Sequence, residues 1–311
     1  MNEKVVITGG AGFIGSNLVR KLLDENYSVF VLDDLSAGTR ENLPEGALLV
    51  KMDICAPDIT RHFEGAHTVF HLAAKTSLTD CVAHPTEAAR VNVLGSVNVL
   101  RASVEVGVKH FVYADTSAEY EGINQFPSRT EEVRPLSVYA CSKAGGALFC
   151  RAFSELHGMS VTLVRYFNVY GRAQDWRRVV PPVMSAFTLK LLRNERPLIF
   201  GNGMKRRDFI HVDDVNAFHL KLLREPQIRG KAYNLGSGQD FSILEIYQMI
   251  EEKIRSGLKP EFRPDLPMEA LRTLADLSET VATGWKPQIQ IEEGISDFIE
   301  YTRERLCSPL W

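Results

Sequence analysis

A phenol and an ammonium group stand four residues apart in the stretch Tyr139-Ala140-Cys141-Ser142-Lys143. Residues at this spacing lie on the same face of an α-helix. A nearby cation lowers the pKa of a phenol, which would allow the tyrosine to remove a proton from a substrate hydroxyl group. The pair by itself is a weak signal, because an exposed lysine above a half-buried tyrosine has the same spacing.

Three glycines near the N-terminus, Gly9, Gly12 and Gly15, follow an apolar run at 4–8 and open a stretch of helical periodicity. Glycines at this spacing allow a tight turn, a close approach of the backbone to a pyrophosphate and close packing of helix on strand. The helix N-terminus adds unpaired N–H groups. Because the motif lies between a strand pattern and a helix pattern, it predicts a dinucleotide site rather than an ordinary glycine turn.

Acidic residues follow the second and third apolar runs. Asp33 lies at the offset of about twenty residues where an acid hydrogen-bonds the ribose hydroxyls of a dinucleotide. An acid there repels a ribose 2′-phosphate and no arginine follows directly, so we expect NAD rather than NADP. Asp34 is either a second ribose contact or a solvated turn residue. Asp53 and Ile54 are expected at the adenine, although a strand-terminal aspartate is also a common helix cap.

Alternating strands and helices must position these residues. Short apolar runs at 4–8, 28–33, 48–52, 68–72 and 110–114 are expected as parallel strands, with a further strand at 160–166. Helical patterns lie at 14–26, 87–106 and 139–157. Strands that alternate with helices imply right-handed crossovers. The sequence therefore predicts an α/β fold with a doubly wound, Rossmann-type parallel sheet.

The pattern becomes irregular after about residue 171. Proline-rich segments and a short strand at 198–200 interrupt helical patterns such as 243–255 and 292–303. We expect residues 1–170 to form the NAD-binding domain and residues 171–311 to form mostly a smaller C-terminal α/β lobe for the substrate. Residues 209–236 are the exception, because they can return to pack on the main sheet.

The composition is that of a globular protein, with 45% hydrophobic and 24% charged residues among 311. A net charge of -3 with scattered Lys and Arg predicts no nucleic-acid partner. The five cysteines lack the paired spacing of metal ligands, so neither disulfides nor a metal site is implied. The N-terminus runs straight into a strand and no long apolar run follows, so we expect a cytoplasmic protein without a membrane partner.

Together, these motifs resemble the extended short-chain dehydrogenase/reductase family, and within it the branch of NAD-dependent nucleotide-sugar epimerases and dehydratases. The resemblance covers nearly the whole chain, and the motifs occur in the family's order. Besides the glycine motif and Tyr139 to Lys143, it rests on Asp33 to Gly38, Asp53-Ile54, His71 to Ala74, Asn92 to Gly95, Arg165 to Gly171, Arg207 to Val215 and Tyr233 to Gly238.

The resemblance implies roles for individual residues. Tyr139 would be the base, and Lys143 would also hold the nicotinamide ribose. The third catalytic residue would be Thr116, with Ser117 as the alternative if the loop is shifted by one residue. Asn92 would support the cofactor site. Further cofactor contacts are implied for Phe13, Ile14, Leu72, Ala73, Ala74 and Tyr166.

The substrate contacts implied by the resemblance are Thr116, Ser117, Asn168, Val179, Phe200, Arg207 and Arg263. Asn168, Arg207 and Arg263 would bind the diphosphate, since the planar guanidinium group forks onto phosphate oxygens. Thr273 resembles the family residue that borders the sugar's 2-substituent. Its small side chain predicts that N-acetylhexosamines fit, unless Thr273 is an ordinary strand residue.

Within the branch, the expected activity is 4-epimerisation of a UDP-hexose, in which hydride leaves C4 for NAD and returns to the other face of a rotated 4-keto sugar. Dehydratases and decarboxylases usually carry Glu two residues after the hydroxyl, where this chain has Ala118, with Glu119 adjacent. A nucleotide-sugar 4,6-dehydratase or UDP-glucuronate decarboxylase is the alternative, followed by a non-catalytic NAD-binding sensor.

Two segments depart from the family pattern. Tyr120-Glu121 replaces the common Tyr-Gly, and Arg263-Pro264-Asp265-Leu266-Pro267 lacks the usual Gly after Arg-Pro. These departures leave the loop geometry near the substrate open. Relatives commonly dimerise through helices like 87–106 and 139–157, so the resemblance also implies a homodimer.

Overall fold

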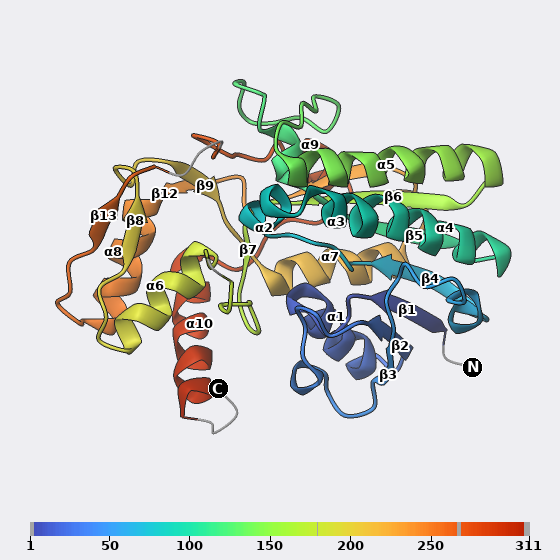
Figure 1. Ribbon diagram of the computed structural model, residues 1–311, viewed down its shortest axis with the longest axis horizontal. Helices are drawn as coiled ribbons and strands as arrows, with labels where there is room; N and C mark the ends of the chain where they lie inside the picture. Colours follow the sequence, from blue (N-terminus) through green and yellow to red (C-terminus); the bar gives the residue numbers. More distant parts are fainter. Residues whose placement is uncertain (1–2, 179, 266–268, 308–311) are drawn as a thin grey trace.

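The computed structural model describes residues 3–178, 180–265 and 269–307. Its centre is a seven-stranded sheet in which every neighbouring pair is parallel, with the strand order β11-β6-β5-β4-β1-β2-β3 (Figure 1). The strands are β1 (Lys4–Thr8), β2 (Ser28–Asp33), β3 (Leu48–Lys51), β4 (Ala66–His71), β5 (His110–Thr116), β6 (Ser160–Tyr166) and β11 (Ala232–Leu235). The predicted doubly wound α/β fold is confirmed.

Helices cover both faces of this sheet. Val5 and Ile7 of β1 pack in a core with α1 (Phe13–Asp24) and α7 (Val212–Arg224). Val6 points into the opposite core, which α4 (Ser96–Glu105) and α5 (Val138–His157) close. Burial on both faces explains why the strand runs are continuously apolar rather than alternating.

The chain order of the strands reverses at β1, which pairs with β2 on one side and β4 on the other. In open α/β sheets, ligands bind beyond the carboxyl ends of the strands at such a reversal. The glycine motif lies there, directly after β1.

The helix expected at 87–106 is interrupted. The structure has α3 (Pro85–Ala89), a π-helical segment at Arg90–Gly95 and then α4, preceded by the short helix α2 (Leu78–Ala83). Gly95 packs so closely on Ile54 that an added Cβ would lie 2.6 Å from its Cδ1 atom. π-Helical insertions of this kind are frequent at functional sites.

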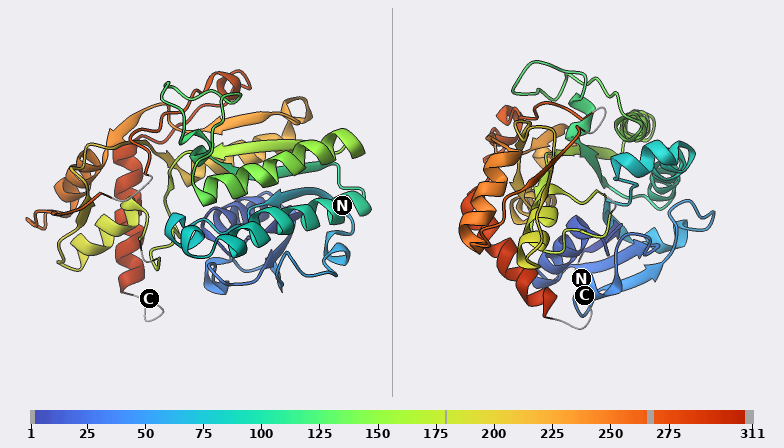
Figure 2. Two further views of the ribbon diagram at one scale, coloured as in Figure 1. Left: turned by 45° about the horizontal axis from the view of Figure 1, so that its top comes forward. Right: turned by 60° about the vertical axis from the view of Figure 1, so that its left-hand side comes forward.

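The C-terminal lobe lies at one end of the molecule, on the side of the strands' carboxyl ends (Figures 1 and 2). Its helices α6 (Val183–Leu192), α8 (Ile243–Ile254) and α10 (Ile291–Leu306) enclose a separate hydrophobic core. Its short paired strands are β7 (Val169–Tyr170) with β10 (Ile210–His211), β8 (Leu198–Phe200) with β13 (Glu261–Arg263), and β9 (Arg206–Asp208) with β12 (Asp240–Ser242).

Part of the later chain returns to the main sheet. Helix α7 contacts α1, and β11 extends the sheet by pairing with β6 so that Leu235 lies opposite Tyr166. The short helix α9 (Ser278–Val281) then packs near β11. Among the described residues, no helix is long and apolar enough to cross a membrane.

Candidate active site

A cleft of about 1070 Å³ separates the carboxyl ends of the strands from the C-terminal lobe. Its volume lies just above the usual range for small-molecule sites. The expected cofactor residues that line it are Gly9, Gly12, Phe13, Ile14, Gly15, Asp33, Asp34, Asp53, Ile54, Leu72, Ala73, Ala74, Tyr139, Lys143 and Tyr166. The expected substrate residues that line it are Thr116, Ser117, Asn168, Phe200 and Arg207.

At the glycine turn after β1, the backbone at Gly9 lies directly against the backbone of the loop after β4. Gly9 has a φ of 71°, and an added Cβ there would lie 2.6 Å from the backbone N of Ala73. A Cβ at Gly15 would collide with the Gly9 carbonyl. Gly12 is the N-cap of helix α1, and because it has no side chain it makes no capping hydrogen bond to the first turn. The first N–H groups of α1 therefore remain available to an anion, which is what a dinucleotide pyrophosphate requires.

The two aspartates after β2 differ in environment. Asp33 is buried at the cleft wall, where its carboxylate accepts hydrogen bonds from the backbone N–H groups of Ala11 at 2.9 Å and Leu35 at 2.8 Å. Burial raises the pKa of Asp33, while these bonds oppose the shift. Asp34 is exposed and accepts a bond from the Ser36 N–H, as a turn residue does. Asp33 thus presents a held carboxylate to the cleft, in keeping with a ribose contact.

The π-helical segment Arg90–Gly95 contacts both the expected adenine end of the cofactor site and helix α5, which carries Tyr139 and Lys143. Arg90 donates to the Asp53 carboxylate at 2.9 Å, at the end where adenine is expected. Asn92 accepts a bond from the Lys75 N–H at 2.8 Å, donates to the Lys75 carbonyl at 2.9 Å and donates to the Ser142 hydroxyl at 2.8 Å. Asn92 is fully buried and does not line the cleft. The structure therefore places Asn92 behind the site, where it positions the loop after β4 and helix α5.

Tyr139, Thr116 and Lys143 all line the cleft. Burial raises the pKa of Tyr139 to about 12, opposed by a hydrogen bond with the Thr116 side chain. Burial lowers the pKa of Lys143 to about 8, and its Nζ atom lies 4.0 Å from the centre of the Tyr113 ring. In the chain by itself, burial therefore raises the phenol pKa, and the lowering expected from the Lys143 ammonium is not found. The bond to Tyr139 favours Thr116 over Ser117 as the third residue.

Glu119 points away from the cleft. Its carboxylate lies 2.9 Å from Nε of Arg165, which also lies 3.0 Å from the Asp115 carboxylate, and all three side chains are buried. Burial, followed by the Asp115 charge, raises the pKa of Glu119 well above its usual range. Two carboxyl groups thus share one guanidinium. Ala118, not Glu119, lines the cleft.

The substrate half of the cleft contains a buried arginine. Arg207 lies 3.3 Å from the Glu269 carboxylate and donates to the Arg206 carbonyl at 2.9 Å. Asn168 donates to the Asp208 carbonyl at 2.8 Å and to the Thr273 hydroxyl at 3.2 Å. Thr273 itself lines the cleft. Its place beside the sugar's 2-substituent stays a prediction.

One expected substrate residue is not found in the cleft lining of the described chain, and another cannot be placed. Arg263 is about half exposed and pairs with Glu261 at 2.7 Å, outside the cleft lining found among the described residues. Arg263 lies opposite Phe200 of β8, which does line the cleft, but its side chain is bound to Glu261, so its role as a diphosphate ligand stays a prediction. Val179 lies outside the described residues.

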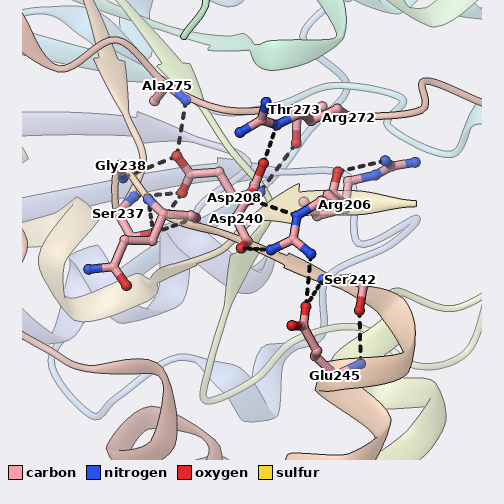
Figure 3. Close-up of polar contacts among 12 residues, drawn as sticks. Arg206, Asp208, Ser237, Gly238, Asp240, Ser242, Glu245, Arg272, Thr273 and Ala275 are labelled. Carbon is pink, nitrogen blue, oxygen red and sulfur yellow. Dashed lines mark hydrogen bonds and ion pairs between the residues drawn. The ribbon is translucent and has the colours of Figure 1, made fainter. Parts of the chain in front are cut away.

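A polar network behind Arg207 and Thr273 holds this wall of the cleft (Figure 3). The buried Asp208 carboxylate accepts bonds from the N–H groups of Ser237 at 2.7 Å, Gly238 at 3.1 Å and Ala275 at 3.1 Å. Arg206 donates to the Asp240 side chain at 2.8 Å and to Glu245 at 3.1 Å, and Arg272 also contacts Asp240 (Figure 3). Arg206 is therefore a structural residue rather than a free surface charge.

Several charged residues line the cleft that sequence reasoning did not assign to the site, among them Glu121, Arg178 and Glu269. The departure from Tyr-Gly at Tyr120-Glu121 was the available signal for Glu121. Arg178 and Glu269 lie in irregular segments, where sequence periodicity gives no position for a side chain.

Comparisons with known proteins agree with this geometry. The family model described as "NAD dependent epimerase/dehydratase family" matches residues 5–236. The crystal structure of a UDP-glucose 4-epimerase from Thermotoga maritima with UDP-glucose is 33% identical with a TM-score of 0.93, covering 97% of this chain and 99% of the other. A UDP-N-acetylglucosamine 4-epimerase from Methanobrevibacter ruminantium in complex with UDP-N-acetylmuramic acid is 29% identical, with a TM-score of 0.93 and coverage of 98% and 99%.

Relatives with another activity are also similar. The dTDP-D-glucose 4,6-dehydratase of Mus musculus is 29% identical over 97% of this chain and 89% of its own length. The similarity therefore reaches both epimerases and dehydratases. Matched over most of its length, with a glycine turn, a ribose-side aspartate and a Tyr–Thr–Lys centre in one cleft, the chain belongs to the NAD-dependent epimerase/dehydratase family of nucleotide-sugar enzymes.

Proposed function

We propose that the protein is a 4-epimerase of a UDP-hexose and that it also accepts UDP-N-acetylhexosamines. The observation that supports this choice over elimination is the orientation of Glu119. Elimination requires an acid or base beside the sugar in addition to Tyr139, and at the relevant position the cleft presents the methyl group of Ala118 while Glu119 is bound to Arg165. Epimerisation at C4 needs no such group.

Three residues of the chain have separate roles in the reaction at C4. Tyr139 removes the proton of the 4-hydroxyl group and later returns it, so the enzyme is unchanged after each cycle. The Thr116 hydroxyl, which is bonded to Tyr139, hydrogen-bonds the same sugar oxygen. Lys143, with a pKa of about 8, is mostly protonated at neutral pH and holds a positive charge in the buried centre. When bound, NAD supplies the reversible uptake of the hydride from C4.

The wall formed by the lobe suits the nucleotide diphosphate. Arg207 presents a buried guanidinium to the cleft, and Asn168 stands next to Thr273. A diphosphate would compete with Glu269 for Arg207, since a guanidinium forms bidentate bonds with either group. The charge of Glu269 keeps Arg207 compensated until substrate binds, because an unpaired buried charge is costly.

We also propose a homodimer. Helix α5 carries exposed apolar side chains at Leu148, Phe149 and Leu156, and Leu94 is exposed on the neighbouring π-helical segment. Leu148 and Leu156 are eight residues apart, so they share one face of the helix. An apolar face of this kind on a folded protein commonly marks an interface, and α5 and the π-helical segment are in contact.

The direct test is to incubate the purified protein with UDP-galactose and, separately, UDP-N-acetylglucosamine, and to follow the sugar protons by NMR. We expect C4 inversion to an equilibrium mixture, with no accumulation of free NADH because the hydride is returned. The controls are UDP-glucuronate and dTDP-glucose. Formation of a 4-keto-6-deoxy sugar or a pentose, with no C4 inversion of either hexose, would overturn the assignment.

A further inference from the structure

The segment that follows β7 in the chain is fastened to the dinucleotide-binding half at two points. The Asn17 side chain, on α1, donates to the Arg172 carbonyl at 2.8 Å. Arg177 donates from Nη2 to the Ala37 carbonyl at 2.6 Å, in the loop that follows Asp33. Residues 172–178, called the strap below, therefore span from the start of α1 to the loop after β2. Figure 1 shows this yellow-green segment descending from β7 toward α1.

The strap also forms hydrogen bonds to the C-terminal lobe and among its own residues. Gln174 donates to the Val169 carbonyl at 2.8 Å and accepts a bond from the Ser185 hydroxyl of α6 at 2.9 Å. The Asp175 carboxylate accepts bonds from the backbone N–H and the Nε of Arg177, both at 3.1 Å. Asp175 thereby fixes the direction of the Arg177 side chain. The Arg177 guanidinium therefore links the strap to the loop after β2 in the dinucleotide-binding half.

The strap and the loop that follows Asp33 both line the cleft and are joined by the bond from Arg177 to Ala37. Ser36, Ala37 and Gly38 of the loop are lining residues, as are Gln174, Asp175 and Trp176 of the strap. Each attachment point is close in the chain to a group expected to hold the dinucleotide: Ala37 follows Asp33, and Asn17 follows the free N-terminus of α1 at Phe13. We propose that the strap closes over the dinucleotide and that Arg177 is the residue that retains the cofactor between turnovers.

Release of the cofactor requires the strap to open first. A dinucleotide seated between Asp33 and the α1 N-terminus leaves past the Ala37 side of the cleft only when the strap separates from that loop. The separation breaks the bond from Arg177 to Ala37. A hydrogen bond from a charged donor to a carbonyl is stronger than a neutral one, although exposure of the Arg177 side chain weakens it. Binding of the cofactor itself does not require Arg177.

The experiment measures cofactor release without substrate. Wild-type protein and the variants Arg177→Ala and Arg177→Lys are loaded with NAD, separated from free NAD, and mixed with a large excess of NAD labelled with a heavy isotope. Loss of the unlabelled NAD is followed by mass spectrometry of the bound fraction. The matched control is Arg129→Ala, since Arg129 is an exposed arginine paired with a nearby carboxylate, Glu131.

We expect Arg177→Ala to release NAD about fivefold faster than wild type, as loss of one partly exposed charged hydrogen bond would give. Arg177→Lys should fall between the two, because it keeps the charge but not the forked donor. Thermal melting of the cofactor-free proteins should be the same for all four. Equal release rates for Arg177→Ala, Arg129→Ala and wild type would overturn the proposal. Because no sugar is present, the result does not depend on which nucleotide sugar the enzyme converts.

Discussion

Both oxygens of the Glu121 carboxylate accept hydrogen bonds from Ser137, one from its backbone N–H at 2.8 Å and one from its hydroxyl at 2.9 Å. Ser137 caps helix α5 by accepting a bond from the Ala140 N–H at 3.1 Å. Tyr139 is the second residue of that helix. Glu121 lies on the loop that begins at Thr116. The contact therefore fixes the start of the helix that carries the base relative to the loop that carries its partner.

Replacing Glu121 by Ala should lower kcat about tenfold or more, because small displacements between reacting groups have large effects on rate. The KM for the nucleotide sugar and the retention of NAD should change much less. Glu121→Gln, which keeps one acceptor for Ser137, should recover part of the rate. The control is Glu131→Ala on the same connection, where the side chain is exposed. Steady-state kinetics of the four proteins decides, and a kcat unchanged in Glu121→Ala would contradict the positioning role.

Replacing Tyr139 by Phe removes only the oxygen that exchanges a proton with the sugar. Turnover should fall by at least about a hundredfold, as expected for loss of general base catalysis. NAD should stay bound, since its site is otherwise intact. Thr116→Val, which removes the hydrogen bond to Tyr139, should reduce kcat less severely. NMR of the sugar and mass spectrometry of bound NAD check both statements. Near-native turnover by Tyr139→Phe would refute the assignment of the base.

Much of this architecture was predictable because local rules and tertiary packing agree in the first half of the chain. The turn at Gly9 and the acid at Asp33 follow from the spacing of a strand, a turn and a helix, and the backbone contact between Gly9 and Ala73 explains why no side chain fits there. The pair Tyr139 and Lys143 follows from helical periodicity. In each case the side chain's position is set by its own element.

The failures have a common physical cause, which is dependence on partners distant in sequence. The break in the helix at Arg90–Gly95 accompanies close packing of Gly95 on Ile54 and bonds from Asn92 to Lys75. Arg263 was expected at the diphosphate because of its motif, and its strand β13 pairs with the much earlier strand β8, which leaves Arg263 opposite Phe200 and outside the cleft lining of the described residues. Periodicity within one segment contains no information on such pairings.

The shared guanidinium of Arg165 gives a pH dependence of stability. The folded-state pKa of Glu119 is raised by burial and by Asp115, so it lies above the unfolded value of about 4.3. The stabilising contribution of the protonated group is therefore fully present below about pH 4 and decreases as the pH rises through the folded-state pKa. Ionised Glu119 adds a second buried negative charge to a cluster with one cation.

Glu119→Gln should behave like the protonated wild-type protein at every pH. Its Tm should lie close to that of wild type near pH 5 and should exceed it increasingly toward pH 9. Thermal melts from pH 5 to pH 9 test this trend, with Glu105→Gln as an exposed control whose carboxylate forms an ion pair on the surface of α4. A difference in Tm that stays constant with pH would show that Glu119 does not titrate in this range.

The proposed dimer makes a separate prediction. Leu156 is 76% exposed and Leu148 is 64% exposed on α5, so an acidic residue at either position costs the monomer little. Leu156→Glu and Leu148→Glu should therefore shift the mass in light scattering from about twice 34.9 kDa toward 34.9 kDa. Leu271→Glu on the lobe, where Leu271 is 77% exposed, is the matched control. A wild-type protein that is already monomeric at micromolar concentration would exclude this interface.

The sugar's 2-substituent is expected beside Thr273. This residue lines the cleft, and its hydroxyl lies 3.2 Å from the Asn168 side chain and 3.3 Å from the Asp208 N–H. A Thr side chain is short, so the adjoining space can hold an N-acetyl group. Thr273→Tyr would fill that space with an aromatic ring while leaving room for a hydroxyl group. The variant should therefore distinguish two substrates that differ only at C2.

We expect Thr273→Tyr to lower kcat/KM for UDP-N-acetylglucosamine at least about tenfold and for UDP-glucose less than about threefold, since steric exclusion acts only on the larger group. Thr273→Val is the matched control, because it removes the hydroxyl that contacts Asn168 without adding bulk. Any loss from that missing bond should affect both sugars alike in both variants. The excess loss in Thr273→Tyr on the N-acetylated substrate alone therefore measures the contact with the 2-substituent. Equal losses on the two sugars would mean that Thr273 does not border C2, and that the space for the N-acetyl group lies against another wall of the cleft.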